Sequence, residues 1–362
     1  MQIIYCSNVT LPNCLLLPLI VSFHNKDIAG YNELTSLESS QEETGWKLIH
    51  GDVFRPPSSN PMLLSILVGT GSQIGVSFLL ALIACVLKLL NPMKKGQTLT
   101  CIIMLYVLCG SVAGYCSSRL YKFCDAQDWK KCTILTATAF PGLLFSLFMV
   151  LNFFLGIVGA ATHVSSVTIL LMFLLWVCLS TPLVFIGSYY GFKAPKIEVP
   201  CKTNQIARIV PEQPFYTQHP YSGLLGGMLP FGSVCIELFF IMGALWLHQY
   251  YYVMSFLVAV MLILVSTCAT VSVVMTYLQY CCENHRWWWS SFLNCAMAGL
   301  YLFIYSLWFL STKMSLVGFL PVIVYLTYMS MISIAFSLVC GSVGFYSSFW
   351  FTKTIYSAVK VD

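Results

Sequence analysis

Charged side chains are scarce in this sequence, and long apolar runs take up most of the chain. Charged residues make up 9% of the 362 residues, while apolar residues make up 58%. The mean hydropathy of +0.81 lies well outside the range of an ordinary soluble domain. This composition excludes a soluble globular protein and indicates a polytopic membrane protein.

Several kinds of functional site are also missing from the sequence pattern. The net charge of +5 is small and scattered, and no basic face remains once the apolar runs are set aside. We therefore predict no nucleic-acid partner. No phosphate-binding glycine loop and no set of nucleophile, base and orienting group can be recognised. We predict a protein that is not an enzyme and that uses no cofactor.

Cysteine is plentiful, but its placement does not predict a disulfide framework. Most of the 16 cysteines fall inside apolar runs, where a thiol behaves as a small hydrophobic side chain. Five of them recur at near-regular intervals between Cys101 and Cys132, yet no histidine or carboxylate joins them at zinc-like spacing. We predict no disulfide and no metal site.

Eight apolar stretches are each long enough for the roughly 20 helical residues that cross a hydrocarbon core. Helices are required because lipid cannot satisfy the polar groups of an open backbone. The fold class that follows is all-α, a polytopic transmembrane helix bundle. The predicted spans are 62–87, 98–118, 133–155, 166–188, 224–247, 251–279, 289–311 and 319–351.

The remaining segments complete the predicted organisation. Residues 3–23 are apolar but are interrupted by asparagine and proline, so residues 1–23 read as a degraded or truncated ninth span. Residues 24–61 form a polar segment ahead of the membrane domain at 62–351. That domain contains a long polar loop at 193–221, and a short tail at 352–362 closes the chain.

The distribution of lysine and arginine predicts the orientation. Fourteen of the 18 basic residues fall in segments that the eight spans place on one side of the membrane. The positive-inside rule assigns that side to the cytosol, together with the C-terminus. The segments predicted on the cytosolic side are 24–61, 119–131, 193–221, 282–287 and 352–362.

The most distinctive polar stretch is GWKLIHGDVFRPP, which begins at Gly45 and lies just before the first predicted span. A glycine that can adopt backbone angles forbidden to other residues, at Gly51, and a stiff Pro56-Pro57 pair predict a compact turn with an extended exit. Its aromatic and basic side chains suit the headgroup region of a bilayer. The residues singled out in this stretch are Gly45, Trp46, Gly51, Asp52, Phe54, Arg55, Pro56 and Pro57.

This stretch resembles the signature of the nonaspanins, also called the transmembrane 9 superfamily. The resemblance extends in family order from about residue 24 to the end of the chain. Further matching pieces are Ala113-Gly114-Tyr115, residues 187–193, 203–206, 209–213 and 226–232, Arg286-Trp287-Trp288-Trp289, and residues 353–362. The resemblance implies a protein of Golgi and endosomal membranes that sorts and transports transmembrane proteins.

The family resemblance also raises a question about the N-terminus. Nonaspanins begin with a cleaved signal and a large lumenal domain, and neither is found in this sequence. We expect either that the gene start is placed late or that the lumenal part has been lost.

Three further groups carry candidate roles. Glu237 is a carboxylate well inside a predicted span, at a cost on the order of 3 kcal/mol if charged, and is an intramembrane polar candidate. The alternatives are that Glu237 is protonated and hydrogen-bonded to a neighbouring helix, or that it lies near enough to the cytosolic end of the span for its carboxylate to reach water. Cys281 and Cys282 end a span, which is the usual place for palmitoylation. The indoles of Trp287, Trp288 and Trp289 are expected at the headgroup level.

Small residues recur along the spans, and they allow helices to approach closely in lipid. Internal packing is the first expectation, and contact with glycine-rich helices of client transmembrane proteins is the alternative. The proline-rich loop at 193–221 is expected to close the cytosolic ends of the bundle, with a partner-docking surface as the alternative.

The C-terminal residues resemble a retrieval signal. Lys360 lies two positions before Asp362, which carries two carboxylates, so the tail offers one cation and two anions for charge-assisted pairing. In nonaspanins such a terminus resembles a signal read by the coatomer coat. The expected partners are therefore membrane lipids, client transmembrane proteins and the coatomer coat.

Two other functions remain open at this point. A secondary transporter or channel for a small solute would suit eight or nine spans with prolines inside them, although paired intramembrane charges are lacking. Replacing Glu237 with glutamine would distinguish a transporter from a sorting receptor. A proton-coupled transporter would lose its activity, whereas a sorting receptor would keep working. A structural subunit of a larger complex would instead co-purify with partners in fixed stoichiometry.

Overall fold

The computed structural model describes residues 45–87, 95–125, 127–159, 163–218, 220–246, 253–314 and 318–358. The ninth span predicted at residues 3–23 and the tail residues Lys360 and Asp362 lie outside these ranges. The described residues are largely helical and contain no strand, which confirms the all-α prediction.

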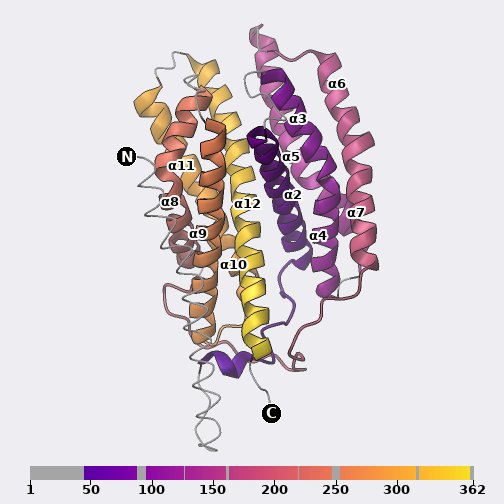
Figure 1. Ribbon diagram of the computed structural model, residues 1–362, viewed down its shortest axis with the longest axis vertical. Coiled ribbons are helices and arrows are strands. Elements are labelled where there is room, and N and C mark those ends of the chain that lie inside the picture. The colour runs from indigo at the N-terminus through magenta and orange to yellow at the C-terminus, as the bar shows by residue number, and fades with distance from the viewer. Residues whose placement is uncertain are drawn as a thin grey trace, which may run out of the picture. The chain divides into compact units, whose positions relative to one another are not determined.

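Long helices account for most of the described chain (Figure 1). The first are η1 (Gly45–Ile49), α2 (Pro61–Val86), α3 (Lys95–Leu108), α4 (Gly110–Phe123), α5 (Trp129–Val158) and α6 (Ser166–Leu175). A π-helical turn, η2 (Trp176–Ser180), joins α6 to α7 (Thr181–Lys193). The remaining helices are α8 (Tyr221–Trp246), α9 (Val253–Cys281), α10 (Trp287–Ala296), α11 (Ala298–Lys313) and α12 (Phe319–Ala358).

Eight segments of the described chain are long and apolar enough to cross a membrane, in agreement with the eight predicted spans. Three of them combine consecutive helices, namely α3 with α4, α6 with α7, and α10 with α11. The segments are 61–86, 100–123, 129–158, 166–193, 221–239, 257–281, 287–313 and 319–358. Hydropathy alone therefore predicts every span in the described part of the chain.

The chain divides into two compact units. Unit 1 comprises residues 1–57, 198–297 and 343–362, and its described helices are η1, α8, α9, α10 and the last part of α12. Unit 2 comprises residues 58–197 and 298–342, with α2 to α7, α11 and the first part of α12.

Unit 2 packs through small residues. Helices α4 and α7 lie side by side (Figure 1), and a Cβ added at Gly187 would collide with the backbone of Ser111. A Cβ at Gly114 would likewise collide with the backbone of Val184 and Ser188. These glycines let two spans approach more closely than larger side chains permit. They serve packing within the bundle, which was the first expectation for the small-residue faces.

Unit 1 packs through a polar ladder between α9 and α12. The Ser348 hydroxyl lies 2.6 Å from that of Ser272 and 2.9 Å from that of Thr276. One turn further along each helix, the hydroxyls of Tyr280 and Thr352 are 2.6 Å apart. All five side chains are buried. These hydrogen bonds hold the two helices in a single register, whereas two helices joined by apolar contacts alone could slide past each other.

Candidate functional site

The signature stretch folds as a short helix followed by turns at one end of unit 1. Helix η1 covers Gly45–Ile49, turns follow to Phe54, and Pro56 and Pro57 continue without regular structure. This matches the predicted compact turn and extended exit. The positive backbone angle, however, is at Gly45, with φ of 82°, and not at Gly51.

Gly51 is required for a different reason from the one the sequence suggested. A Cβ added there would lie 2.7 Å from Cγ of Asn204, and the backbone N–H of Asn204 donates to the Gly51 carbonyl at 2.9 Å. A side chain at position 51 would therefore push away the loop that follows α7. The glycine serves close approach between two segments and not an unusual φ angle.

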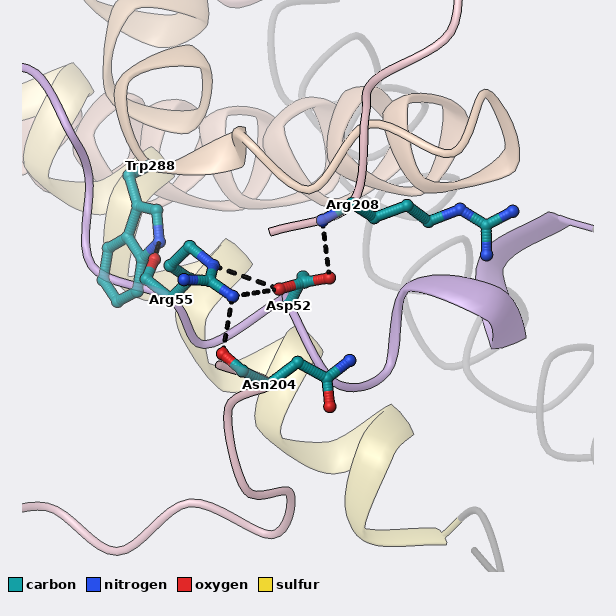
Figure 2. Close-up of polar contacts among 5 residues, drawn as sticks. All are labelled: Asp52, Arg55, Asn204, Arg208 and Trp288. Carbon is teal, nitrogen blue, oxygen red and sulfur yellow. Dashed lines mark hydrogen bonds and ion pairs between the residues drawn. The ribbon is translucent and has the colours of Figure 1, made fainter. Parts of the chain in front are cut away.

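Asp52 is buried and forms the centre of a polar cluster at this end of unit 1, drawn in Figure 2. Its side chain is 3% exposed and pairs with Nη2 of Arg55 at 2.6 Å. The same guanidinium nitrogen donates to the carbonyl oxygen of Asn204 at 2.7 Å. We call Asp52, Arg55, Asn204, Arg208 and Trp288 the Asp52 cluster.

Two further donors complete the Asp52 cluster. The backbone N–H of Arg208 donates to Oδ2 of Asp52 at 3.2 Å, while its guanidinium points away (Figure 2) and pairs with Glu283 at 3.4 Å. The indole N–H of Trp288 donates to the Arg55 carbonyl at 2.8 Å. Apart from the local pair of Asp52 and Arg55, these contacts join segments distant in sequence, so the cluster ties the signature to the loop after α7 and to the start of α10.

Phe54 and two of the three indoles predicted at the headgroup level, those of Trp287 and Trp288, are buried in the protein, whereas Trp289 and Trp46 are half-buried. Trp287, Trp288 and Phe54 are 0%, 2% and 2% exposed. The Trp287 and Trp288 rings stack at 4.5 Å, which places them in an aromatic core rather than among headgroups. Arg55 likewise does not face water or lipid phosphate freely, because it is paired with Asp52.

Two other sequence pieces meet the signature at the same end of unit 1. The Tyr356 hydroxyl, on α12, donates to the Trp46 carbonyl at 2.9 Å, and its ring lies 6.2 Å from that of Phe54. The loop before α8 reaches the end of α9, where Gln213 donates to the Cys282 carbonyl at 2.9 Å. The signature, 203–206, 286–289 and 353–358 thus form one structural cluster.

His285 lies close to this cluster, and its pKa is lowered mainly by burial of the ring. It is 6% exposed, and its Nδ1 is buried without a hydrogen-bond partner among the described residues. Burial lowers the pKa of His285, and the nearby Arg286 and Arg55 lower it further while Asp52 raises it. The ring is therefore held in its neutral form at neutral pH.

The other candidate residues are not brought into this cluster. Glu237 lies half-buried on α8, and no ion pair in the described chain includes it. Cys281 is exposed at the end of α9 and Cys282 is half-buried, so palmitoylation of this pair stays a prediction. Within the described residues no group of histidine, cysteine and carboxylate side chains is arranged to hold a metal ion.

Three residues at this site were not predicted from the sequence: Arg208 of the Asp52 cluster, its ion-pair partner Glu283, and the neighbouring His285. Arg208, Glu283 and His285 carried no motif of their own. The available signal was indirect, since the stretches at 203–206 and 286–289 stood out together with the signature.

The described residues have an all-α architecture with eight segments long and apolar enough to cross a membrane, which defines a polytopic membrane protein. The family model described as Endomembrane protein 70 matches residues 2–319. The chain therefore belongs to the endomembrane protein 70 family, whose relatives are named as transmembrane 9 superfamily members.

Three relatives illustrate the similarity. Transmembrane 9 superfamily member 10 of Arabidopsis thaliana is 44% identical over 93% of this chain and 53% of its own length. Member 2 of Homo sapiens is 42% identical over 93% and 51%, and human member 4 is 39% identical over 95% and 53%. The chain thus spans about half the length of these relatives. No solved structure matches it.

Proposed function

We propose that this protein sorts and transports transmembrane proteins in Golgi and endosomal membranes, through lateral contact with client helices and without catalysing a reaction. Membership of the endomembrane protein 70 family supports a membrane protein of the endomembrane system. The more specific role rests on one feature of unit 2, an open groove between α11 and α12.

Small residues line this groove within the membrane-crossing segments. It encloses about 350 Å³, and its small residues are Gly299, Ser330, Ser333 and Ser337. Apolar side chains form the rest of the lining, namely Leu300, Phe303, Ile334 and Leu338. Small side chains let the backbone of another helix approach closely, and glycine-rich client helices are the partners best able to use such a surface.

The groove also offers an unused polar group. The hydroxyl of Ser333 is buried and has no hydrogen-bond partner among the described residues. Because this oxygen has almost no exposed surface, a client helix with a small polar side chain could supply a partner only after neighbouring side chains move aside. The glycines of α4 and α7 are already packed against backbone, and Gly299 is also close to α12, because a Cβ there would lie 2.7 Å from the Ser333 carbonyl oxygen.

The C-terminal tail provides the proposed link to the cytosol. In this proposal, the C-terminus is cytosolic, and Lys360 and Asp362 bind the coatomer coat by charge-assisted pairing. Client recognition in the bilayer and coat binding at the tail then act in one molecule. Lys360 and Asp362 lie outside the described residues, so this part of the proposal rests on the sequence.

The experiment that tests the proposal measures surface delivery of two reporters in cells with and without this protein. One reporter carries a glycine-rich transmembrane helix and the other a leucine-only helix. Loss of delivery confined to the glycine-rich reporter supports recognition of client helices. Equal delivery of both reporters in the two kinds of cell would overturn the proposal.

A further inference from the structure

Three helices of unit 2 line an open cavity of about 560 Å³, at the end of α4, the start of α5 and the end of α7. It is distinct from the groove between α11 and α12. Its lining combines two lysines, four aromatic rings and three small or amide side chains, namely Lys122, Gln127, Trp129, Thr133, Phe185, Ser188, Tyr189, Phe192 and Lys193.

The mouth of this cavity is positively charged. The ammonium group of Lys122 is fixed there by hydrogen bonds to the carbonyl oxygens of Phe192 at 2.7 Å and Ala194 at 2.8 Å. Lys193 is exposed and makes no ion pair with any residue that the structure describes. Two cations and no carboxylate therefore line the cavity.

The carboxylates nearest in sequence do not neutralise this charge. Asp125 pairs with Lys196 at 2.6 Å, and Asp128 pairs with Lys131 at 2.9 Å. Segments 119–131 and 193–197 together carry six basic side chains and two acidic ones. The excess positive charge favours an anionic ligand at the mouth.

The deeper part of the cavity is apolar and follows α7 into the membrane-crossing segment. Eight residues separate Lys193 from Phe185, which corresponds to about 12 Å along a helix. Tyr189 and Phe185 are 63% and 40% exposed on this wall, and Trp129 opposite is 50% exposed. A ligand here would place an anion at the lysines and a hydrocarbon chain beside the rings.

We propose that this cavity binds an anionic phospholipid. The phosphate lies against the ammonium groups of Lys193 and Lys122, and an acyl chain runs along Tyr189 and Phe185. Basic pockets between transmembrane helices are suited to such headgroups. Inorganic phosphate carries the same anionic group but has no hydrocarbon chain that could contact the apolar wall. This site is independent of the proposed sorting function.

The test is native mass spectrometry of the full-length protein in detergent, titrated with phosphatidylserine or with phosphatidylcholine of the same acyl chains. Lys193→Glu should weaken phosphatidylserine binding by about tenfold or more and leave phosphatidylcholine binding unchanged. Lys353→Glu is the matched control. Lys353 is exposed on α12 and does not line the cavity, so phosphatidylserine binding should change less than about twofold.

Two outcomes would overturn the proposal. Equal weakening by Lys193→Glu and Lys353→Glu would show a general surface-charge effect. Displacement of phosphatidylserine by equimolar inorganic phosphate would assign the site to a soluble anion. Because a charge reversal can disturb folding, Lys193→Ala and Phe185→Ala are measured alongside, and both should weaken phosphatidylserine binding without shifting the thermal unfolding midpoint.

Discussion

The indole N–H of Trp287 donates a 2.8 Å hydrogen bond to the carbonyl oxygen of Val53, 234 residues earlier in the chain. Both residues are completely buried. The adjacent Trp288 makes the same kind of bond to Arg55. The tryptophans at the start of α10 therefore hold the backbone of the signature in place, and they do so with a polar group that phenylalanine lacks.

Replacing Trp287 with phenylalanine should destabilise the protein by about 1–3 kcal/mol, because it leaves the buried Val53 carbonyl without its donor. The measurement is the thermal unfolding midpoint of the purified protein in detergent. Trp350→Phe is the control, since Trp350 is 55% exposed on α12. An equal effect of the two substitutions would contradict a specific role for the Trp287 donor.

The ion pair between Asp52 and Arg55 should show energetic coupling in a double-mutant cycle. Asp52→Ala leaves a half-buried guanidinium without its carboxylate, whereas the double substitution removes both charges. We expect a coupling free energy of about 1–3 kcal/mol from unfolding in denaturant. The exposed pair Lys131 and Asp128 has the same sequence spacing and should show a much smaller coupling. Comparable coupling in the two pairs would refute the buried arrangement.

His285 should make stability depend on pH. Its pKa in the folded protein is lowered below the ordinary value of 6.5, so the unfolded chain binds a proton first as the pH falls. The stabilising contribution is complete above about pH 6.5 and is lost as the pH falls toward the folded-state pKa. Asp52, Arg55 and Arg286 are the charged groups that act on this ring.

The measurement compares unfolding midpoints at about pH 5 and about pH 8 for the wild type and for His285→Gln. The variant cannot protonate at this position, so the difference between the two pH values should shrink. An unchanged difference would mean that His285 is not buried in its neutral form.

The tail carries a prediction about location in the cell. Lys360→Ala combined with Asp362→Ala removes the cation and one of the two anions proposed to bind the coat. The protein should then move forward from the Golgi, which fluorescence microscopy of a tagged protein in fixed cells can follow. A steady-state location identical to that of the wild type would disprove retrieval by this signal.

Much of the fold could be predicted from the sequence, because spans depend on local apolar content. The eight segments follow from hydropathy alone, since a hydrocarbon core selects long apolar helices wherever they occur. The turn at the signature also follows from local residues. These features need no knowledge of distant contacts.

The long-range contacts of the site could not be predicted in the same way. Tryptophans beside an arginine at the start of a span resemble interfacial anchors, and only the position of Val53 shows why Trp287 is buried. A glycine inside a turn suggests a special φ angle, and only the position of Asn204 shows that Gly51 serves close approach. Both errors arise because local sequence does not specify which distant segment packs against a residue.

The central claim is that the groove between α11 and α12 receives client helices, and one substitution tests it most directly. Ser330→Leu fills the groove with a larger apolar side chain that lipid tolerates. Ser146→Leu makes the same change on α5, at an exposed position outside the groove lining. Each variant is expressed in cells that lack the wild-type protein, and surface delivery of the glycine-rich reporter is measured. The account predicts that Ser146→Leu restores delivery and Ser330→Leu does not. Full restoration by Ser330→Leu, at equal expression, would contradict it.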